Sequence, residues 1–420
     1  SVVGIELAGD GLKLAMGHEA LVGIQKGESG LGATLTSPWW GQMDQGQALY
    51  RPVPLLLLGV AGGLSGAPYD PEDPGDSPFP YHILTLAFHV LATLLLFELA
   101  LELCKSNKVA LVAAALFATL PVHTEALYDV AGIAELCAAA FGLGSWLCWL
   151  RAGDKPLANP AMLGGSLVLL ALACLSKESA FALPLIFFLV DAGRSGGRLD
   201  FKAALAKLPG LGAMVVVLVA LLALRYSVLG TLTPDYNVAN GLDNPLIFED
   251  ALTRMSNGMR MMACAVLVMF GVNPLRGDGL SFGFSADYSA TQIEVLGAFS
   301  PLNLVSILFV LGSVALAFMA AKRCSMRAGL WLALLASLLL SSNVLFPIGT
   351  IFGERLLYFP SALLVLFVAM FLVRFCKASL VVAVLLAIGG GVWSMDRVSA
   401  WEKPYELIKV TEREDAPNSA

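Results

Sequence analysis

The chain has 420 residues, of which 57% are hydrophobic and only 14% are charged, and its formal net charge is −6. Because soluble domains carry roughly 25% charged residues, this composition excludes an ordinary soluble protein and indicates an integral membrane protein. The net negative charge, with no basic stripe along the sequence, also excludes nucleic acid as a partner.

Residues 1–80 are predicted to form an external segment. They are rich in Gly, Pro and Asp, and their one apolar piece, residues 53–63, is too short to cross a bilayer. The sequence starts at Ser1 without Met, signal peptide or leading apolar helix, so we expect an internal start, with a first transmembrane helix missing.

Residues 81–395 are predicted to form the transmembrane bundle of an all-α, polytopic membrane protein. A bilayer core of about 30 Å needs roughly 20 apolar residues for each helix, and about ten stretches approach that length. Their expected ranges, in chain order, are 81–101, 107–122, 131–150, 161–176, 178–191, 208–228, 301–321, 328–346, 355–374 and 377–395.

The long loop at 229–300 contains one further apolar segment, Met261–Val272, which follows Arg254 and Arg260. At about a dozen residues, this segment suits an interfacial or re-entrant helix better than a span. The distribution of Lys and Arg supports this choice, because basic residues crowd cytoplasmic loops. With residues 1–80 outside, every alternate loop is basic, whereas an added span would place the last two basic loops outside.

Ionisable side chains gather at the predicted outer ends of the helices. Such groups are costly near a bilayer and are functional candidates by default. For single members simpler interpretations stay open: Lys177 and Arg225 suit snorkelling to the interface, and Glu354 with Arg355 suits local charge neutralisation. These helix ends lie on the same, outer face of the membrane, where we expect their side chains to surround a cavity. The residues are His123, Glu125, Asp129, Lys177, Glu178, Arg225, Glu354, Arg355 and Tyr358.

The sequence does not predict a metal site or a redox-active pair of cysteines. The seven Cys include no C-x-x-C pair and the four His show no H-E-x-x-H spacing, so we interpret the Cys as small core residues and expect no zinc site. His82 and His89 are interpreted as packing residues. No Asn-x-Ser/Thr sequon occurs, which favours a bacterial inner membrane over the secretory pathway.

Five strings, in the same order, resemble the membrane region of the transmembrane and tetratricopeptide-repeat (TMTC-type) proteins. These proteins are GT-C glycosyltransferases related to the protein O-mannosyltransferases. The resemblance spans about residues 10–418, and residues 396–420 would form an external helical tail that leads into tetratricopeptide repeats. The strings are Ser37-Pro38-Trp39-Trp40-Gly41, Leu49-Tyr50-Arg51-Pro52, Leu120-Pro121-Val122-His123-Thr124-Glu125-Ala126, Leu175-Ser176-Lys177-Glu178-Ser179 and Gly353-Glu354-Arg355-Leu356-Leu357-Tyr358-Phe359-Pro360-Ser361.

The resemblance implies a polyprenyl-phosphate sugar donor, usually a hexose such as mannose, and inverting transfer to an acceptor hydroxyl on the non-cytoplasmic face. A protein Ser or Thr is the expected acceptor, with a glycan as an alternative, and the donor is met in the lipid bilayer. That face would be periplasmic in a bacterium and the lumen of the endoplasmic reticulum in a eukaryote. GT-C members differ in metal use, so a divalent metal stays open and no other cofactor is expected.

The same resemblance, with the chemistry it implies, suggests roles for single residues. A departing phosphate needs Arg or Lys to stabilise its growing charge, and the candidates for donor phosphate binding are Arg51, Lys177, Arg225 and Arg355. A hydroxyl acceptor needs a carboxylate base, which GT-C proteins usually carry just after their first transmembrane helix. Asp10 matches that place and Glu125 is the second catalytic candidate, with Glu6 and Asp44 as rivals.

The sequence also departs from the family pattern. Family members often show paired acids where Gly9 here precedes Asp10, so only one acid remains at that place. A surface Asp in a turn beside Gly9 and Gly11 is the alternative interpretation. Ile133 stands where the family tends to have an Arg. Trp40 suits an interfacial anchor as well as a cavity wall. The full set of expected cavity residues is Trp40, Tyr50, His123, Asp129, Glu178, Asp287, Glu354 and Tyr358.

Two other functions compete with a glycosyltransferase. A lipid or solute transporter predicts internal repeats and charges at the middle of the spans. No convincing repeat is present, and Glu135, the one acid that falls within a predicted span, lies near its outer end. A catalytically silent scaffold for tetratricopeptide repeats stays open because Gly9 replaces one of the paired acids.

Overall fold

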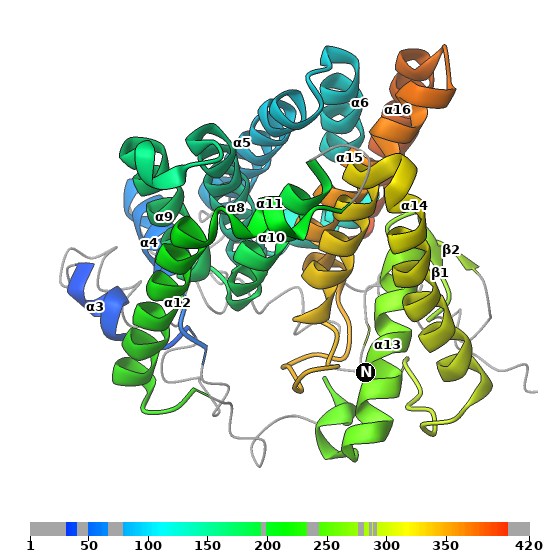
Figure 1. The fold of residues 1–420 in the computed structure, drawn as a ribbon. Helices are drawn as coiled ribbons and strands as arrows, with labels where there is room; N and C mark the ends of the chain where they lie inside the picture. The colour runs from blue at the N-terminus through cyan, green and yellow to red at the C-terminus, as the bar shows by residue number, and fades with distance from the viewer. Residues whose placement is uncertain are drawn as a thin grey trace, which may run out of the picture.

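The computed structural model describes residues 31–39, 49–65, 79–194, 199–232, 243–275, 281–284, 288 and 292–401. These residues form a bundle of α-helices, and a short antiparallel ladder of β1 (Val272–Asn273) with β2 (Ser281–Phe282) lies beside it (Figure 1). The prediction of an all-α polytopic membrane protein is confirmed.

Six helices in the described ranges are long and apolar enough to cross a bilayer. All ten ranges predicted as spans contain helix, but four of them hold shorter or broken helices; α9 (Pro160–Cys174) and α10 (Leu183–Arg194), for example, have 15 and 12 residues. Helix α4 (Pro52–Ser65), which contains the apolar piece predicted to be too short to cross, has 14 residues. The six are α5 (Phe79–Cys104), α8 (Ile133–Ala152), α12 (Leu208–Leu229), the first part of α14 (Pro301–Leu339), α15 (Tyr358–Phe375) and α16 (Ser379–Trp401).

A proline ends α6 (Asn107–Ala118) and turns the chain by 50° towards η2 (Pro121–His123) and α7 (Thr124–Tyr128). Pro121 lacks an N–H donor and disfavours a helical conformation in the residue before it. Accordingly, Leu120 is extended, with φ −70° and ψ 120°. The two pieces together are apolar enough for a seventh, broken span. The bend places α7 in contact with α5, α8 and α16.

The 39 residues of α14 fold back on themselves near Cys324 instead of running straight. Four small or apolar residues, Ala317, Ala321, Ala328 and Leu332, belong to one buried cluster. In a straight helix the middle two would lie about 10 Å apart along the axis, which is too far for contact. The two arms therefore correspond to the two separate spans that the sequence predicts for this region.

Helix α8 lies at the centre of the bundle, where nearly all of its residues are buried. Helices α12 and α16, in contrast, expose most of their apolar side chains, as lipid-facing helices do. Glycines allow α10 and α14 to meet backbone to backbone. A Cβ on Gly193 would lie 2.7 Å from the Ser325 carbonyl oxygen, and one on Gly329 would lie 2.7 Å from the Leu189 carbonyl oxygen.

Helix α13 (Ala251–Val268) packs against α14 in the part of the chain predicted to be interfacial (Figure 1). It is not among the helices apolar enough to cross a bilayer, and its position relative to the membrane stays a prediction. Asn257 ties the helix to the following loop, because its side chain donates to the Leu296 carbonyl oxygen at 2.7 Å and accepts from the Leu296 N–H at 3.1 Å.

At one end of the bundle, ion pairs join the ends of α5, α8, α10 and the start of α12. Arg151 lies 3.1 Å from Glu98, and Lys207 lies 3.0 Å from Asp191. The indole N–H of Trp149 also donates to Asp191, at 2.7 Å. These are the ends that the basic loops predict to be cytoplasmic.

Candidate functional site

At the opposite ends of these helices, charged side chains from separate parts of the chain contact one another. They come from the start of α4, from α7 and the start of α8, from the break between α9 and α10, from the end of α12, and from η7 (Glu354–Leu357). We call this group the charge cluster, and its members are Arg51, Glu125, Asp129, Glu135, Lys177, Glu178, Arg225 and Arg355.

Local sequence sets the positions of the basic members. Pro52 is the first residue of α4, so Arg51 lies just before the helix starts. Lys177 is extended, with φ −158° and ψ 144°, between α9 and η5 (Glu178–Ala182). Arg225 lies in the last turns of α12, which ends at Gly230 in a left-handed conformation with φ +70°.

Two arginines bind one carboxylate in the charge cluster. Arg51 donates from Nε and from a terminal nitrogen to Glu178 Oε2, at 3.0 and 2.8 Å, and Arg225 donates to Glu178 Oε1 at 3.0 Å. Burial acts to raise the pKa of Glu178, but the two guanidinium groups outweigh it and lower that pKa to about 2. Glu178 is therefore an anion at neutral pH and a poor proton acceptor.

Lys177 is buried beside these groups and contacts the carboxylate of Glu135, in the first turn of α8. Burial, followed by the positive charges of Arg51 and Arg355, lowers the pKa of Lys177 well below its ordinary value. Nearby carboxylates counteract this shift only in part. An anion that bound beside Lys177 would raise the pKa of Lys177 again.

Arg355 joins η7 to the acidic residues that follow the α6 bend. Its backbone N–H donates to Glu125 Oε2 at 2.9 Å, and its guanidinium donates to Asp129 Oδ2 at 3.1 Å. The Asp129 carboxylate also accepts from the Ala131 N–H at 3.0 Å, so it is fixed from two sides. The Arg355 Nε also lies 3.5 Å from Glu125 Oε1, and the Arg355 side chain is 30% exposed, whereas Asp129 is buried.

Glu354, the neighbour of Arg355, points to a different set of partners. Its side chain is fully buried, with Arg397 of α16 at 2.7 Å. The Tyr288 hydroxyl donates to Glu354 at 2.7 Å, and the Asn273 amide donates to that hydroxyl at 3.1 Å. The two adjacent charges therefore do not neutralise each other, as the simpler interpretation of the sequence proposed, but each pairs with a distant residue.

A separate buried group joins α5, η2 and α15. His89 Nδ1 lies 2.7 Å from the Tyr358 hydroxyl, and His123 Nε2 lies 2.7 Å from Ser361 Oγ. Tyr50 likewise turns to a local partner, donating its hydroxyl to the Leu35 carbonyl oxygen at 2.8 Å. These contacts of His123, Tyr358 and Tyr50 lie outside the charge cluster, and the predicted role of the three residues in the cavity stays a prediction.

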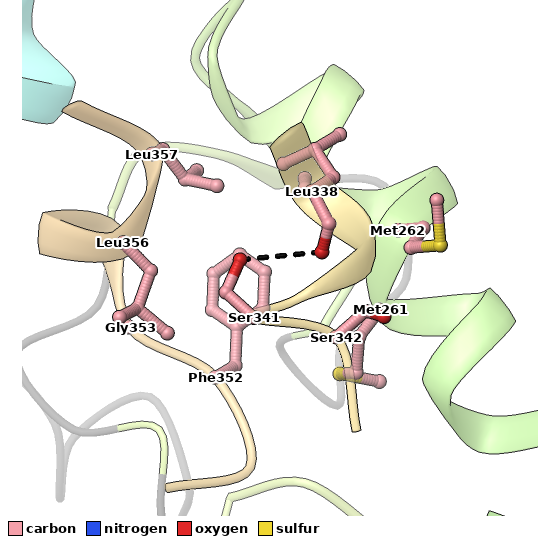
Figure 2. A pocket seen from close by; sticks show the side chains of 10 residues that line it. Met261, Met262, Leu338, Ser341, Ser342, Phe352, Gly353, Leu356 and Leu357 are labelled. Carbon is pink, nitrogen blue, oxygen red and sulfur yellow. Dashed lines mark hydrogen bonds between the residues drawn. The ribbon is translucent and has the colours of Figure 1, made fainter. Parts of the chain in front are cut away.

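Two apolar pockets flank η7, and Leu356 lines both of them. Figure 2 shows the first, where Leu356 and Leu357 face Met261 and Met262 of α13 across Phe352. The second pocket is lined by apolar side chains from α8, α10 and α15 and by Glu135, the partner of Lys177. Apolar space therefore reaches the edge of the charge cluster.

Several predicted residues lie outside the described ranges, namely Glu6, Asp10, Trp40, Asp44 and Asp287. Among the residues that the structure describes, no three His, Cys, Asp or Glu side chains are grouped to hold a metal ion.

Sequence reasoning missed two residues with a place in these networks. Arg397 was assigned to the polar tail, although a lone Arg at the end of an apolar run is a signal for a buried partner. Glu135 was noted only as an acid near the end of a span, and its contact with Lys177 joins segments 42 residues apart. Such pairs depend on which helix ends meet in space.

The known proteins that are similar in sequence to this chain include several that are named protein O-mannosyl-transferases. Protein O-mannosyl-transferase Tmtc2 of Drosophila melanogaster is 32% identical over 179 residues, which are 41% of this chain and 18% of that protein. Protein O-mannosyl-transferase TMTC3 of Homo sapiens is 25% identical over 352 residues, 77% of this chain and 36% of that protein. Protein O-mannosyl-transferase F38B6.6 of Caenorhabditis elegans is 28% identical over 68% of this chain.

The chain spans only 18% to 38% of the length of these three relatives. No protein-family model matches the sequence. No solved structure matches it either.

Proposed function

We propose that the chain, which is similar to TMTC-type protein O-mannosyl-transferases at 25–32% identity, is the membrane portion of a GT-C glycosyltransferase. It transfers a hexose such as mannose from a polyprenyl-phosphate donor to a Ser or Thr hydroxyl of a protein, on the non-cytoplasmic face and with inversion. The observation that carries the proposal is the charge cluster, in which four cations from four segments meet beside apolar pockets.

The cations suit the leaving group. When the glycosidic bond breaks, charge grows on the donor phosphate, and preorganised Arg and Lys side chains stabilise it. Arg51 and Arg225 already hold one carboxylate from two sides, at 2.8 and 3.0 Å, which is the arrangement that a phosphate needs. Lys177, whose pKa is lowered by burial and then by nearby positive charge, completes the proposed phosphate site.

The apolar pockets suit the lipid part of the donor. A polyprenyl chain remains in the bilayer while its phosphate reaches the interface, so its site requires apolar walls next to cations. The small pocket lined by Leu356 and by Glu135, the partner of Lys177, marks where apolar side chains adjoin the charge cluster, and at about 20 Å³ it would have to widen to admit the polyprenyl chain. A soluble sugar nucleotide would have no use for apolar walls.

The carboxylates suit activation of the acceptor. A Ser or Thr hydroxyl is a weak nucleophile at neutral pH, and a carboxylate that accepts its proton accelerates attack. Glu178 is held too strongly anionic for that role. We assign the base to Asp10 and give Glu125 the task of holding Arg355, through the 2.9 Å bond to its backbone N–H. One base suffices for a single displacement with inversion, by analogy with inverting glycosidases.

Transfer of labelled mannose from polyprenyl-phosphate mannose to a Ser/Thr peptide tests the proposal. Asp10→Asn is expected to lower kcat by about 100-fold or more, because general bases contribute that much. Arg151→Gln is the matched control, since that exposed pair lies at the other end of the bundle. Unchanged transfer by Asp10→Asn and Glu125→Gln would remove the site assignment, and movement of donor across vesicles without transfer would favour a transporter.

A further inference from the structure

Arg397, near the end of α16, contacts three parts of the chain at once. One terminal nitrogen donates to the Pro121 carbonyl oxygen at 2.8 Å and lies 2.7 Å from Glu354. The guanidinium also lies over the ring of Phe284, 4.3 Å from its centroid. The side chain is only 10% exposed, so these contacts form in a largely dry environment.

Close packing of α16 against neighbouring segments holds Arg397 where it can make these contacts. A Cβ on Gly390 would lie 2.5 Å from the Thr119 carbonyl oxygen, so the helix touches the backbone just before the bend. Trp393 packs on Gly271, where any Cβ would lie 2.6 Å from the indole and the backbone has φ +78°. Figure 1 shows α16 (orange) beside α6 (cyan).

The two backbone segments that Arg397 joins are the ones that carry Arg355 and Glu125. Glu354, its ion-pair partner, immediately precedes Arg355 in η7. Pro121, whose carbonyl oxygen it binds, starts the bend that leads to Glu125. A buried carboxylate without its cation is strongly unfavourable, so on loss of Arg397 the Glu354 side chain takes up a proton or moves. In both cases the ion pair that ties η7 to α16 is lost, and Arg355 is no longer held from that side.

We propose that Arg397 is a positioning residue that holds η7 and the α6 bend in register, so that Arg355 meets Glu125 and Asp129. The proposal rests on the proposed function, because it assigns Arg397 an effect on donor phosphate binding through Arg355. It also gives α16, the last described helix, a direct link to the charge cluster.

Hydrogen exchange of the peptide 353–358 tests the positioning without any assay of transfer, because the Arg355 N–H donates to Glu125. In the full chain in lipid nanodiscs, Arg397→Gln and Glu354→Gln should each speed this exchange by about tenfold. The double variant should be no faster than either single, since the pair acts as a unit. Asp396→Asn, on the exposed neighbour, is the matched control and should stay unchanged. Exchange within about twofold of the wild type in Arg397→Gln would overturn the proposal.

Kinetics separate positioning from a merely structural role. With Arg355 displaced, KM for polyprenyl-phosphate mannose should rise about tenfold in Arg397→Gln, while KM for the acceptor peptide stays constant. Arg397→Lys should recover part of the loss, because it keeps the charge beside Glu354. A fall in kcat with both KM values unchanged would mean fewer folded molecules and would also overturn the proposal. If the wild type transfers no mannose, the proposed function fails, whereas the exchange experiment still decides whether Arg397 positions Arg355.

Discussion

Arg355 donates its backbone N–H to the Glu125 carboxylate at 2.9 Å, although the two residues lie 230 positions apart in the chain. The bond joins η7, just before α15, to the short helix after the α6 bend, and the Arg355 guanidinium also donates to Asp129. The charge cluster is thus assembled from backbone as well as side-chain contacts. Its geometry therefore depends on where the broken helices end.

Arg355→Lys is expected to lose transfer activity even though it keeps the positive charge. Lys carries the charge, but it cannot fork between Asp129 and an incoming phosphate as a guanidinium does. We predict a loss of about 100-fold in kcat/KM for mannosyl transfer, similar to Arg355→Ala. Arg374→Lys, at the exposed far end of the same helix, serves as the control. Activity of Arg355→Lys close to the wild type would show that the fork is not needed.

Glu178 gives the fold an acid-sensitive contact. Its pKa is lowered to about 2 in the folded chain, from an ordinary value of 4.5, so its contribution to stability is complete above about pH 4.5 and disappears as the pH falls through 2. The Tm difference between wild type and Glu178→Gln should therefore be constant from about pH 7 to pH 5 and shrink below that range. Glu98→Gln, from an exposed pair, should show a smaller difference at every pH. A Tm difference for Glu178→Gln that does not shrink on acidification would contradict this interpretation.

Lys177 should report the arrival of a phosphate by taking up a proton. Its pKa is lowered by burial and by Arg51 and Arg355, and an anion bound among these groups raises that pKa. Calorimetric titration of the full chain with polyprenyl phosphate, in buffers of different ionisation enthalpy, should show net proton uptake at alkaline pH. Lys177→Met should abolish the uptake, while Lys108→Met, at an exposed site, should not. Equal proton uptake by wild type and Lys177→Met would exclude Lys177 from the site.

Adjacent glycines in α16 should respond in opposite directions to the same change. A Cβ on Gly390 would clash with the Thr119 carbonyl oxygen at 2.5 Å, whereas a Cβ on Gly389 meets nothing within 4 Å. Gly390→Ala should cost about 1–3 kcal/mol of unfolding free energy through overpacking. Gly389→Ala should be neutral or stabilise by about 0.4–1 kcal/mol. Thermal unfolding in detergent measures both, and equal Tm values would show that α16 is not docked through Gly390.

The sequence was sufficient to predict the long spans, because α5 and α15 each contain a long run of apolar residues that only a bilayer or a deep core accommodates. It also predicted that Arg51, Lys177, Arg225 and Arg355 share one end of the bundle, since the order of the spans places those helix ends together. The structure brings these four residues into one cluster.

The partners within the cluster could not be predicted in the same way. Glu354 and Arg355 are adjacent, and only the fold shows that one binds Arg397 while the other binds Asp129. The break at Lys177, by contrast, agrees with the predicted ranges 161–176 and 178–191, and α10 starts later than expected only because η5 occupies residues 178–182. Tertiary contacts, which leave no local periodic signal, decide which partners the charged residues find.

The affinity of the full chain in nanodiscs for polyprenyl phosphate tests most directly whether the charge cluster binds the donor. Because Arg51 and Arg225 hold Glu178 from both sides, the double variant Arg51→Met with Arg225→Met should weaken binding by about 100-fold or more. The exposed Arg151→Gln should bind as the wild type does. Equal affinity of the double variant and the wild type would place the phosphate elsewhere and contradict the account.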